Sequence, residues 1–100
     1  MGETKMTEDL TSLRVHIQGF VQGIGFRDFL VMAAQANKLD GWVRNRSDGS
    51  VEALVSGGTK AVEAFVQAAA YGHRAAKVRH VDLHVSEPPA EKGFARRPTL

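Results

Sequence analysis

Hydrophobic residues in this chain change their spacing from every second position to every third or fourth, and they do so twice. Residues 13–17 alternate between apolar and polar types, which is the pattern of a strand with one buried face. From Phe26 to Ala36 the apolar residues recur at helical spacing, and a second helical stripe extends from an N-cap at Thr59 to Gly72. Between these stripes, Ser-Asp-Gly at residues 47–49 is a turn signal that predicts a hairpin.

The strand and helix segments follow the order β-α-β-β-α-β. This order predicts an α+β fold, the ferredoxin-like βαββαβ sandwich, in which two helices cover one face of an antiparallel four-stranded sheet. Asn37 tolerates the left-handed conformation of a helix exit, so it is expected to end the first helix. The valines at 78 and 81 lie three residues apart, which indicates a bulge near Arg79 and His80. The expected strands span residues 13–18, 41–45, 51–56 and 78–85, with a possible short fifth edge strand around Phe94.

This topology brings the ends of the first two strands to the same edge of the sheet. A right-handed crossover through the first helix makes the two strands parallel, and the third strand lies between them. Their ends carry the glycine-rich loop and Asn45, separated by two strand spacings, roughly 9–10 Å. Arg27 begins the helix after the loop, and its long side chain can cross much of that gap. We therefore expect Arg27 and Asn45 to face one small group.

The loop before Arg27 has the composition of an anion site. Gly19, Gly23 and Gly25 permit positive φ, so successive backbone N–H groups can turn inward at a helix N-terminus, where phosphate binds readily. Arg27 adds a planar guanidinium that matches phosphate oxygens. From composition alone, a tight turn followed by a solvated arginine is an equally good interpretation. Asn45, taken alone, is more simply interpreted as the residue that starts the hairpin.

Other phosphate-handling classes do not fit. The loop lacks the Gly-Lys-Ser/Thr ending of the nucleotide-binding P-loop, and its glycine spacing is not that of a dinucleotide-binding fold. The chain has no cysteine, which excludes a cysteine-dependent phosphatase and thiolate metal sites.

Composition limits the size and setting of the protein. With 100 residues, 43% of them hydrophobic, the chain can build one core. We expect a flexible tail at residues 1–11 and a single domain at 12–97. The formal charge of +2 comes from interspersed acids and bases, which does not favour a nucleic-acid partner. No apolar run reaches the roughly 18 residues of a membrane span, and the polar N-terminus is not a signal peptide. We therefore expect no membrane partner and a cytoplasmic monomer.

Two motifs carry a resemblance to a known family. GFVQGIGFR at residues 19–27 and GWVRNRSDGSVE at residues 41–52 resemble, in register, the motifs of the acylphosphatase family. The resemblance extends from Leu13 to Phe94 and implies the ferredoxin-like fold. It also implies hydrolysis of the carboxyl-phosphate bond of small-molecule acyl phosphates to a carboxylate and inorganic phosphate. The expected reaction uses no metal, no cofactor and no covalent intermediate, and inorganic phosphate is both product and inhibitor.

The resemblance further implies roles for individual residues. It assigns phosphate binding to Arg27 and orientation of the attacking water to Asn45. Because an acyl phosphate has a good leaving group, positioning water and neutralising phosphoryl charge suffice, and no strong base is required. The chain departs from the family's usual residues at Phe20, Asp28, Asn37-Lys38 and Arg96. The backbone amides expected to cradle the phosphate are those of Phe20, Val21, Gln22, Gly23, Ile24 and Gly25.

Three other functions are alternatives to hydrolysis of acyl phosphates by a stand-alone enzyme. His16 and His84 are expected on neighbouring strands, but two histidines without a further ligand are better interpreted as solvent-facing than as a metal site. A non-catalytic ferredoxin-like module that binds RNA needs aromatic residues on the open sheet face, and no Phe or Tyr is expected there, with Trp42 placed in the core. An acylphosphatase-like domain that handles carbamoyl phosphate within a larger protein is the third. The open face is expected to carry Arg14, His16, Gln18, Asp82 and His84.

Overall fold

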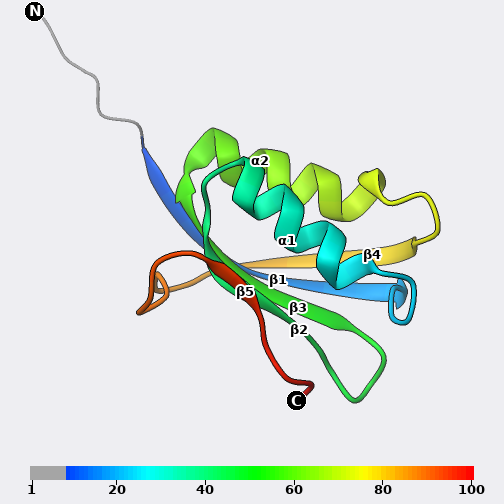
Figure 1. Ribbon diagram of the computed structural model, residues 1–100. Coiled ribbons are helices and arrows are strands. Elements are labelled where there is room, and N and C mark those ends of the chain that lie inside the picture. Colours follow the sequence, from blue (N-terminus) through cyan, green and yellow to red (C-terminus); the bar gives the residue numbers. More distant parts are fainter. Residues whose placement is uncertain (1–8) are drawn as a thin grey trace, which may run out of the picture.

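A computed structural model describes residues 9–100 of the chain. Two helices lie side by side on one face of a twisted sheet (Figure 1). The predicted order β-α-β-β-α-β, followed by a short edge strand, is confirmed. The elements are β1 (Leu10–Phe20), α1 (Phe26–Ala36), β2 (Asp40–Asn45), β3 (Val51–Gly58), α2 (Thr59–Gln67) with the π-helical turn η2 (Ala68–Gly72), β4 (Lys77–Val85) and β5 (Phe94–Arg96).

The strands form one sheet in the order β4-β1-β3-β2-β5. β3 pairs antiparallel with both β1 and β2, so β1 and β2 are parallel to each other with β3 between them, as predicted. β5 pairs parallel with β2, which makes the sheet mixed. Gln18 pairs with His80 and Gly19 with Val78, so Arg79 is the extra residue of a bulge at the predicted place.

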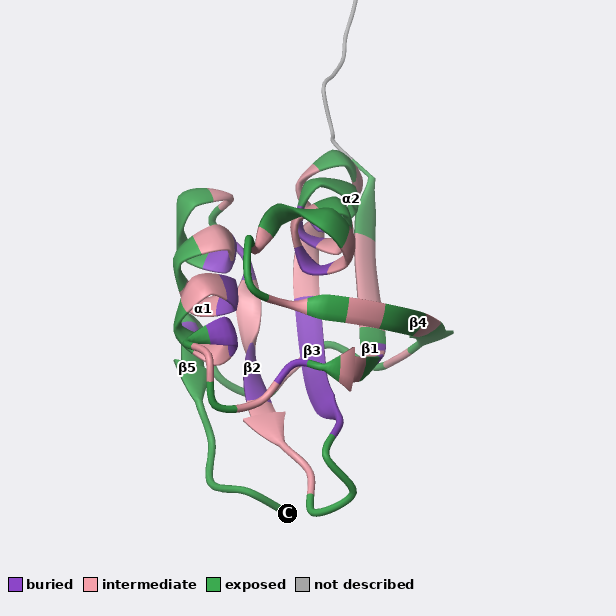
Figure 2. Cartoon of the chain, turned by 90° about the vertical axis from the view of Figure 1, so that its right-hand side faces the viewer, coloured by how far each residue is buried: buried purple, intermediate pink, exposed green. Residues whose placement is uncertain are grey.

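The main core lies between the sheet and the two helices. Buried residues follow β3 and the inner faces of α1 and α2 (Figure 2). Complete burial of one large apolar side chain contributes about 1.5–3 kcal/mol, so this single layer supplies most of the driving force for folding. Its largest fully buried side chains are Val15, Ile17, Val21, Phe26, Leu30, Val43, Val51, Val55, Val62 and Phe65.

Trp42 is buried, as expected, but on the opposite face of the sheet. It precedes Val43, which belongs to the helix-covered core, and successive residues of a strand point to opposite faces. Three guanidinium groups cover its ring, with Cζ atoms 5.7 Å (Arg14), 4.6 Å (Arg44) and 5.2 Å (Arg97) from the ring centroid. Trp42 is only 6% exposed, so its ring offers no surface on which a base could stack.

Some local boundaries differ from the sequence interpretation. Leu10 and Thr11 were assigned to the tail but pair with β3, because the strand pairing continues past the alternating pattern. Residues 1–8 of the expected tail lie outside the described residues. Thr59 was expected to cap α2 but lies inside the helix, where its hydroxyl is hydrogen-bonded to the Thr11 hydroxyl at 2.7 Å. Gly58 is the N-cap, without a side-chain hydrogen bond.

The exit of α1 also differs in one residue. Lys38, rather than Asn37, has the left-handed φ of 57°. The Asn37 side chain instead donates to the Ala33 carbonyl at 2.8 Å, which closes the last helical turn. Among residues 9–100, no helix has the length and apolar character needed to cross a membrane.

Candidate active site

The loop between β1 and α1 presents a run of unpaired backbone donors. Gly23 and Gly25 both have φ of 77°, while Ile24 between them does not have a positive φ. Such alternation turns successive N–H groups toward one side, which is the geometry of an anion nest. The amides of residues 21–25 donate no hydrogen bond to any acceptor among residues 9–100. These donors lie directly before the N-terminus of α1, which carries partial positive charge.

Arg27 lies in the first turn of α1 and is half-buried. Its guanidinium has neither a hydrogen bond nor an ion pair with any group from Asp9 to Leu100. A cation beside the positive end of a helix is unfavourable unless an anion lies near both. The local electrostatics therefore favour a negatively charged ligand at this position.

Asn45 ends β2, and because β1 and β2 both pair antiparallel with β3, this end lies at the same edge of the sheet as the β1–α1 loop, which is on the right in Figure 1. Its Oδ1 is the one buried side-chain polar atom within the described part of the chain that has no hydrogen-bond partner. Leaving such an atom unpaired costs about 1–3 kcal/mol, so it calls for an explanation in the function of the residue.

The hairpin turn does not depend on the Asn45 side chain. Asp48 Oδ1 accepts hydrogen bonds from the Ser50 amide at 2.9 Å and the Ser50 hydroxyl at 2.6 Å. These two bonds hold the pKa of Asp48 below its usual range. The Arg46 amide donates to the Ser50 carbonyl at 2.8 Å, which completes the turn. Asn45 stands directly before this turn, as the simpler interpretation expected, but its Oδ1 takes no part in the hydrogen bonds that hold the turn.

The Gln22 side chain joins the loop to this hairpin. Its Nε2 donates to the Arg46 carbonyl at 2.8 Å and to the Ser50 carbonyl at 2.9 Å. The first of these carbonyls belongs to the residue directly after Asn45. Sequence reasoning assigned only the backbone of Gln22 to the site and missed this contact. A side-chain amide between two apolar positions of a glycine loop was the available signal.

The C-terminal segment also borders Asn45. The Leu100 amide donates to the Asn45 carbonyl at 3.1 Å, and the Ser47 amide donates to the Leu100 carbonyl at 2.9 Å. Pairing along β2 therefore continues beyond β5.

Phe20, at the end of β1, is 56% exposed beside the glycine loop.

Glu52 anchors a charge network on the open face of the sheet. It is 5% exposed and receives hydrogen bonds from Arg14 at 3.1 Å, Arg44 at 2.9 Å and Arg46 at 3.0 Å. Burial alone would raise the pKa of Glu52, but the hydrogen bonds from Arg44 and Arg46 outweigh it and lower the pKa. The side chains of Arg44 and Arg46, the two arginines that flank Asn45 in sequence, are therefore both bound to Glu52.

His16 and His84 do not form a pair. His16 lies opposite Asp82 and is hydrogen-bonded through Nε2 to the Ser50 hydroxyl at 2.8 Å, whereas His84 lies opposite Arg14. His84 faces solvent as expected, but His16 is half-buried, because the hairpin residue Ser50 packs against it. From residue 9 to residue 100 there is no group of three or more potential metal ligands.

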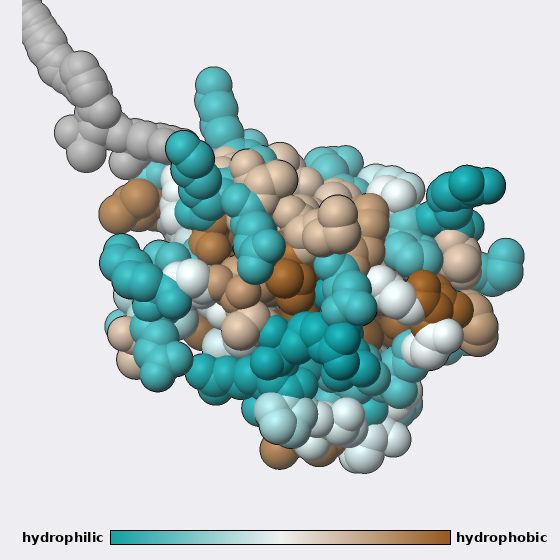
Figure 3. Space-filling view, viewed as in Figure 1, coloured by the Kyte–Doolittle hydropathy of each residue, from teal (hydrophilic) through white to brown (hydrophobic). Residues whose placement is uncertain are grey.

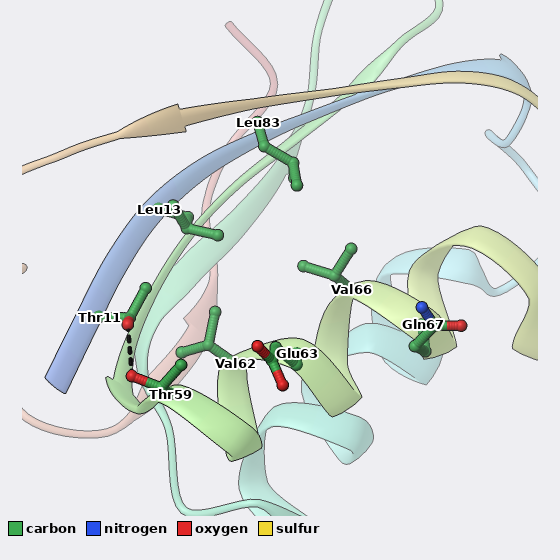
Figure 4. A pocket seen from close by; sticks show the side chains of 8 residues that line it. All are labelled: Thr11, Leu13, Thr59, Val62, Glu63, Val66, Gln67 and Leu83. Carbon is green, nitrogen blue, oxygen red and sulfur yellow. Dashed lines mark hydrogen bonds between the residues drawn. The ribbon is translucent and has the colours of Figure 1, made fainter. Parts of the chain in front are cut away.

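A separate apolar groove lies between α2 and strands β1 and β4 (Figure 4). Its volume is about 270 Å³, and among residues 9–100 Glu63 is the only charged residue that lines it. A groove with one carboxylate and no cation has the wrong charge for a phosphate, so it is not a second candidate for the same ligand. Its lining consists of Thr11, Leu13, Thr59, Val62, Glu63, Val66, Gln67 and Leu83.

Fold and local charge together define a class of protein, a small α+β domain able to hold a phosphate-sized anion at one edge of its sheet. The family model for acylphosphatase matches residues 13–96. The acylphosphatase of Acidiphilium cryptum (strain JF-5) is 48% identical over 83 residues, which are 83% of this chain and 91% of that protein. The acylphosphatase of Acidovorax sp. (strain JS42) is 43% identical over 99 residues, 95% of this chain and 100% of that protein. The chain belongs to the acylphosphatase family.

Solved structures agree with this assignment. The crystal structure of acylphosphatase from Bacillus subtilis superimposes with a TM-score of 0.81 at 38% identity, over 89% of this chain and 99% of that chain. Full-length HypF, in its phosphate- and nucleotide-bound form, matches with a TM-score of 0.84 at 26% identity, over 96% of this chain but 13% of that chain. The chain is thus a hydrolase that acts on acyl phosphates, as the motifs implied. The alternatives of a binding module or a carbamoyl-phosphate-handling domain are not favoured.

Proposed function

We propose that Arg27 and the backbone amides of residues 20–25 hold the phosphoryl group of a small acyl phosphate, and that Asn45 orients the attacking water. One observation carries this assignment: Arg27 follows the loop at the sheet edge where Asn45 ends β2, and neither the Arg27 guanidinium nor the Asn45 Oδ1 has a hydrogen-bonding partner among residues 9–100. Polar groups that stay unpaired in a folded domain reduce its free energy of unfolding, and a bound phosphate and the attacking water would supply the missing partners.

The reaction needs little more than this arrangement. The water oxygen bonds to phosphorus while the bond from phosphorus to the carboxyl oxygen breaks, and the electron pair leaves with the carboxylate. A phosphate oxygen of the substrate takes the proton of the water. Arg27 and the amides neutralise the equatorial oxygens, which is the main catalytic requirement when the leaving group is good. The carboxamide of Asn45 acts on the nucleophile and has little effect on the bound phosphate.

The proposal includes the setting of the enzyme. Inorganic phosphate, the product, fits the same amides and guanidinium and should inhibit competitively. We propose a cytoplasmic monomer that acts on a free small molecule, in keeping with a modest charge of +2 spread over the whole sequence.

The test separates the two roles. Arg27→Gln should lower kcat/KM for benzoyl phosphate by on the order of 10³ and abolish phosphate binding in calorimetry, because the interaction serves both ground state and transition state. Asn45→Ala should lower kcat severely and leave phosphate affinity nearly unchanged. All assays contain EDTA, and a melting curve accompanies each variant.

Arg74→Gln is the matched control, since it removes the same charge from an exposed position before β4. The assignment fails if Arg27→Gln keeps a tenth of the wild-type activity. It also fails if Asn45→Ala remains folded but loses phosphate binding as completely as Arg27→Gln.

A further inference from the structure

An acidic residue directly follows the proposed phosphate-binding arginine. Asp28 lies with Arg27 in the first turn of α1. A carboxylate suits the positive end of a helix, but here it adjoins the place where an anionic substrate would bind. Left unpaired, the Asp28 carboxylate would repel an anionic phosphoryl group bound at Arg27.

Asp28 is held by a residue far away in the sequence. Arg96, in β5, donates from Nη1 to Asp28 Oδ1 at 2.7 Å. β5 lies next to α1 in both ribbon views, and hydrophilic side chains gather across the middle of this face of the molecule (Figures 1, 2 and 3). Arg27 has no ion pair with Asp28, its immediate neighbour. The carboxylate is therefore paired on the β5 side, and the Arg27 guanidinium stays available.

We infer that Arg96 is a positioning residue for substrate binding, which neutralises Asp28 and so keeps its carboxylate from repelling the phosphoryl group. The inference rests on the proposed role of Arg27. The side chains of Arg96 and Asp28 are 47% and 64% exposed, and exposed ion pairs contribute little to folding. The pair therefore matters less for stability than for the charge that the substrate meets.

This role has a definite kinetic signature. Loss of Arg96 leaves a negative charge near a dianionic phosphoryl group, at the surface and partly screened by solvent. KM for benzoyl phosphate and the inhibition constant of inorganic phosphate should rise about three- to tenfold at low ionic strength. kcat should stay within about twofold, because ground state and transition state are repelled alike. The increase should shrink as salt rises, since the Debye length is about 10 Å at 0.1 M and 3 Å at 1 M.

The experiment compares Arg96→Gln with Arg97→Gln, which removes the same charge from the next residue. Arg97 lies over Trp42 and has no contact with Asp28. The expected result is a raised KM for Arg96→Gln alone. Asp28→Asn in the Arg96→Gln background should restore KM and phosphate inhibition to the wild-type range. A purely structural role of Arg96 would not be rescued by removal of the carboxylate.

Two outcomes overturn the inference. Equal KM values for Arg96→Gln and Arg97→Gln would mean that the pair has no effect on binding. Failure of Asp28→Asn to restore KM would mean that Arg96 acts on the phosphate directly or only through folding. Both are scored in enzyme that keeps Arg27, so they leave the proposed function intact if Arg27→Gln still abolishes phosphate binding.

Discussion

A substitution of Gln22 tests whether its side chain fixes the position of the β1–α1 loop relative to Asn45. The change Gln22→Met keeps the length and approximate shape of the side chain but removes both donated hydrogen bonds, to the Arg46 and Ser50 carbonyls. Neither carbonyl is left without a partner, because the Gly49 amide donates to the Arg46 carbonyl at 3.1 Å and the Arg46 amide donates to the Ser50 carbonyl at 2.8 Å. The turn should therefore survive while its tie to the loop is lost.

The magnitude follows from these contacts. Each side-chain hydrogen bond contributes about 0.5–1.5 kcal/mol net, and no buried carbonyl is orphaned, so loss of both bonds should lower the free energy of unfolding by about 1–3 kcal/mol. In a domain of this size that lowers Tm by roughly 4–24 °C. Catalysis should suffer more, because a misplacement of about 1 Å between reacting groups can cost 10²-fold. We expect kcat to fall about 10- to 100-fold, with phosphate affinity within about threefold.

The assay combines thermal melts, benzoyl phosphate kinetics and calorimetry with inorganic phosphate. Gln35→Met is the control, since the Gln35 Nε2 donates to the Phe94 carbonyl at 3.4 Å, away from the loop, and this long bond should contribute little. If the Gln22→Met enzyme has a lowered Tm but the wild-type kcat, Gln22 does not position the loop for catalysis and has a structural role only.

The remaining predictions concern stability. Glu52→Gln should reduce the free energy of unfolding by about 1–3 kcal/mol at pH 7, because three arginines lose a buried carboxylate partner. The folded-state pKa of Glu52 is lowered from its ordinary value of 4.5, so this contribution is present above pH 4.5 and is lost as pH falls through the lowered pKa. Urea titrations of both proteins at pH 7 and pH 3 should show the difference shrink, and a constant difference would contradict the assignment. Gly41→Ala should cost more than about 3 kcal/mol, because its Cβ would lie 1.8 Å from the Leu54 carbonyl oxygen. Gly25→Ala meets no atom within 4 Å and should cost about 1–2 kcal/mol for its φ of 77°, so melts that rank the two variants in the opposite order would disprove this account.

The fold was largely predictable because its signals are local. Alternation placed the first strand, turn and break signals placed the others, and helical spacing placed both helices; the bounds of α1 from Phe26 to Ala36 were correct. The spacing of two valines located the bulge at Arg79. The parallel arrangement of β1 and β2 followed from the β-α-β crossover, because a helix between two strands of one sheet returns the chain to the end at which the first strand began. The glycines of the loop and the family motifs predicted an anion site at the loop, and the structure places that loop at the edge of the sheet where Asn45 ends β2.

The side-chain contacts around the candidate site could not be predicted from local sequence patterns. The side of the sheet on which Trp42 is buried depends on which strands deliver Arg14, Arg44 and Arg97 to its face. Gln22 meets Arg46 and Asp28 meets Arg96 only because the sheet order brings separate segments together. A hydrogen bond between residues far apart in sequence produces no recognisable pattern of residue spacing, because it depends on strand register and on side-chain rotamers. For the same reason, the residues and motifs suggested what Arg27 and Asn45 do, but only the folded structure of residues 9–100 shows that the Arg27 guanidinium and the Asn45 Oδ1 lack hydrogen-bonding partners there.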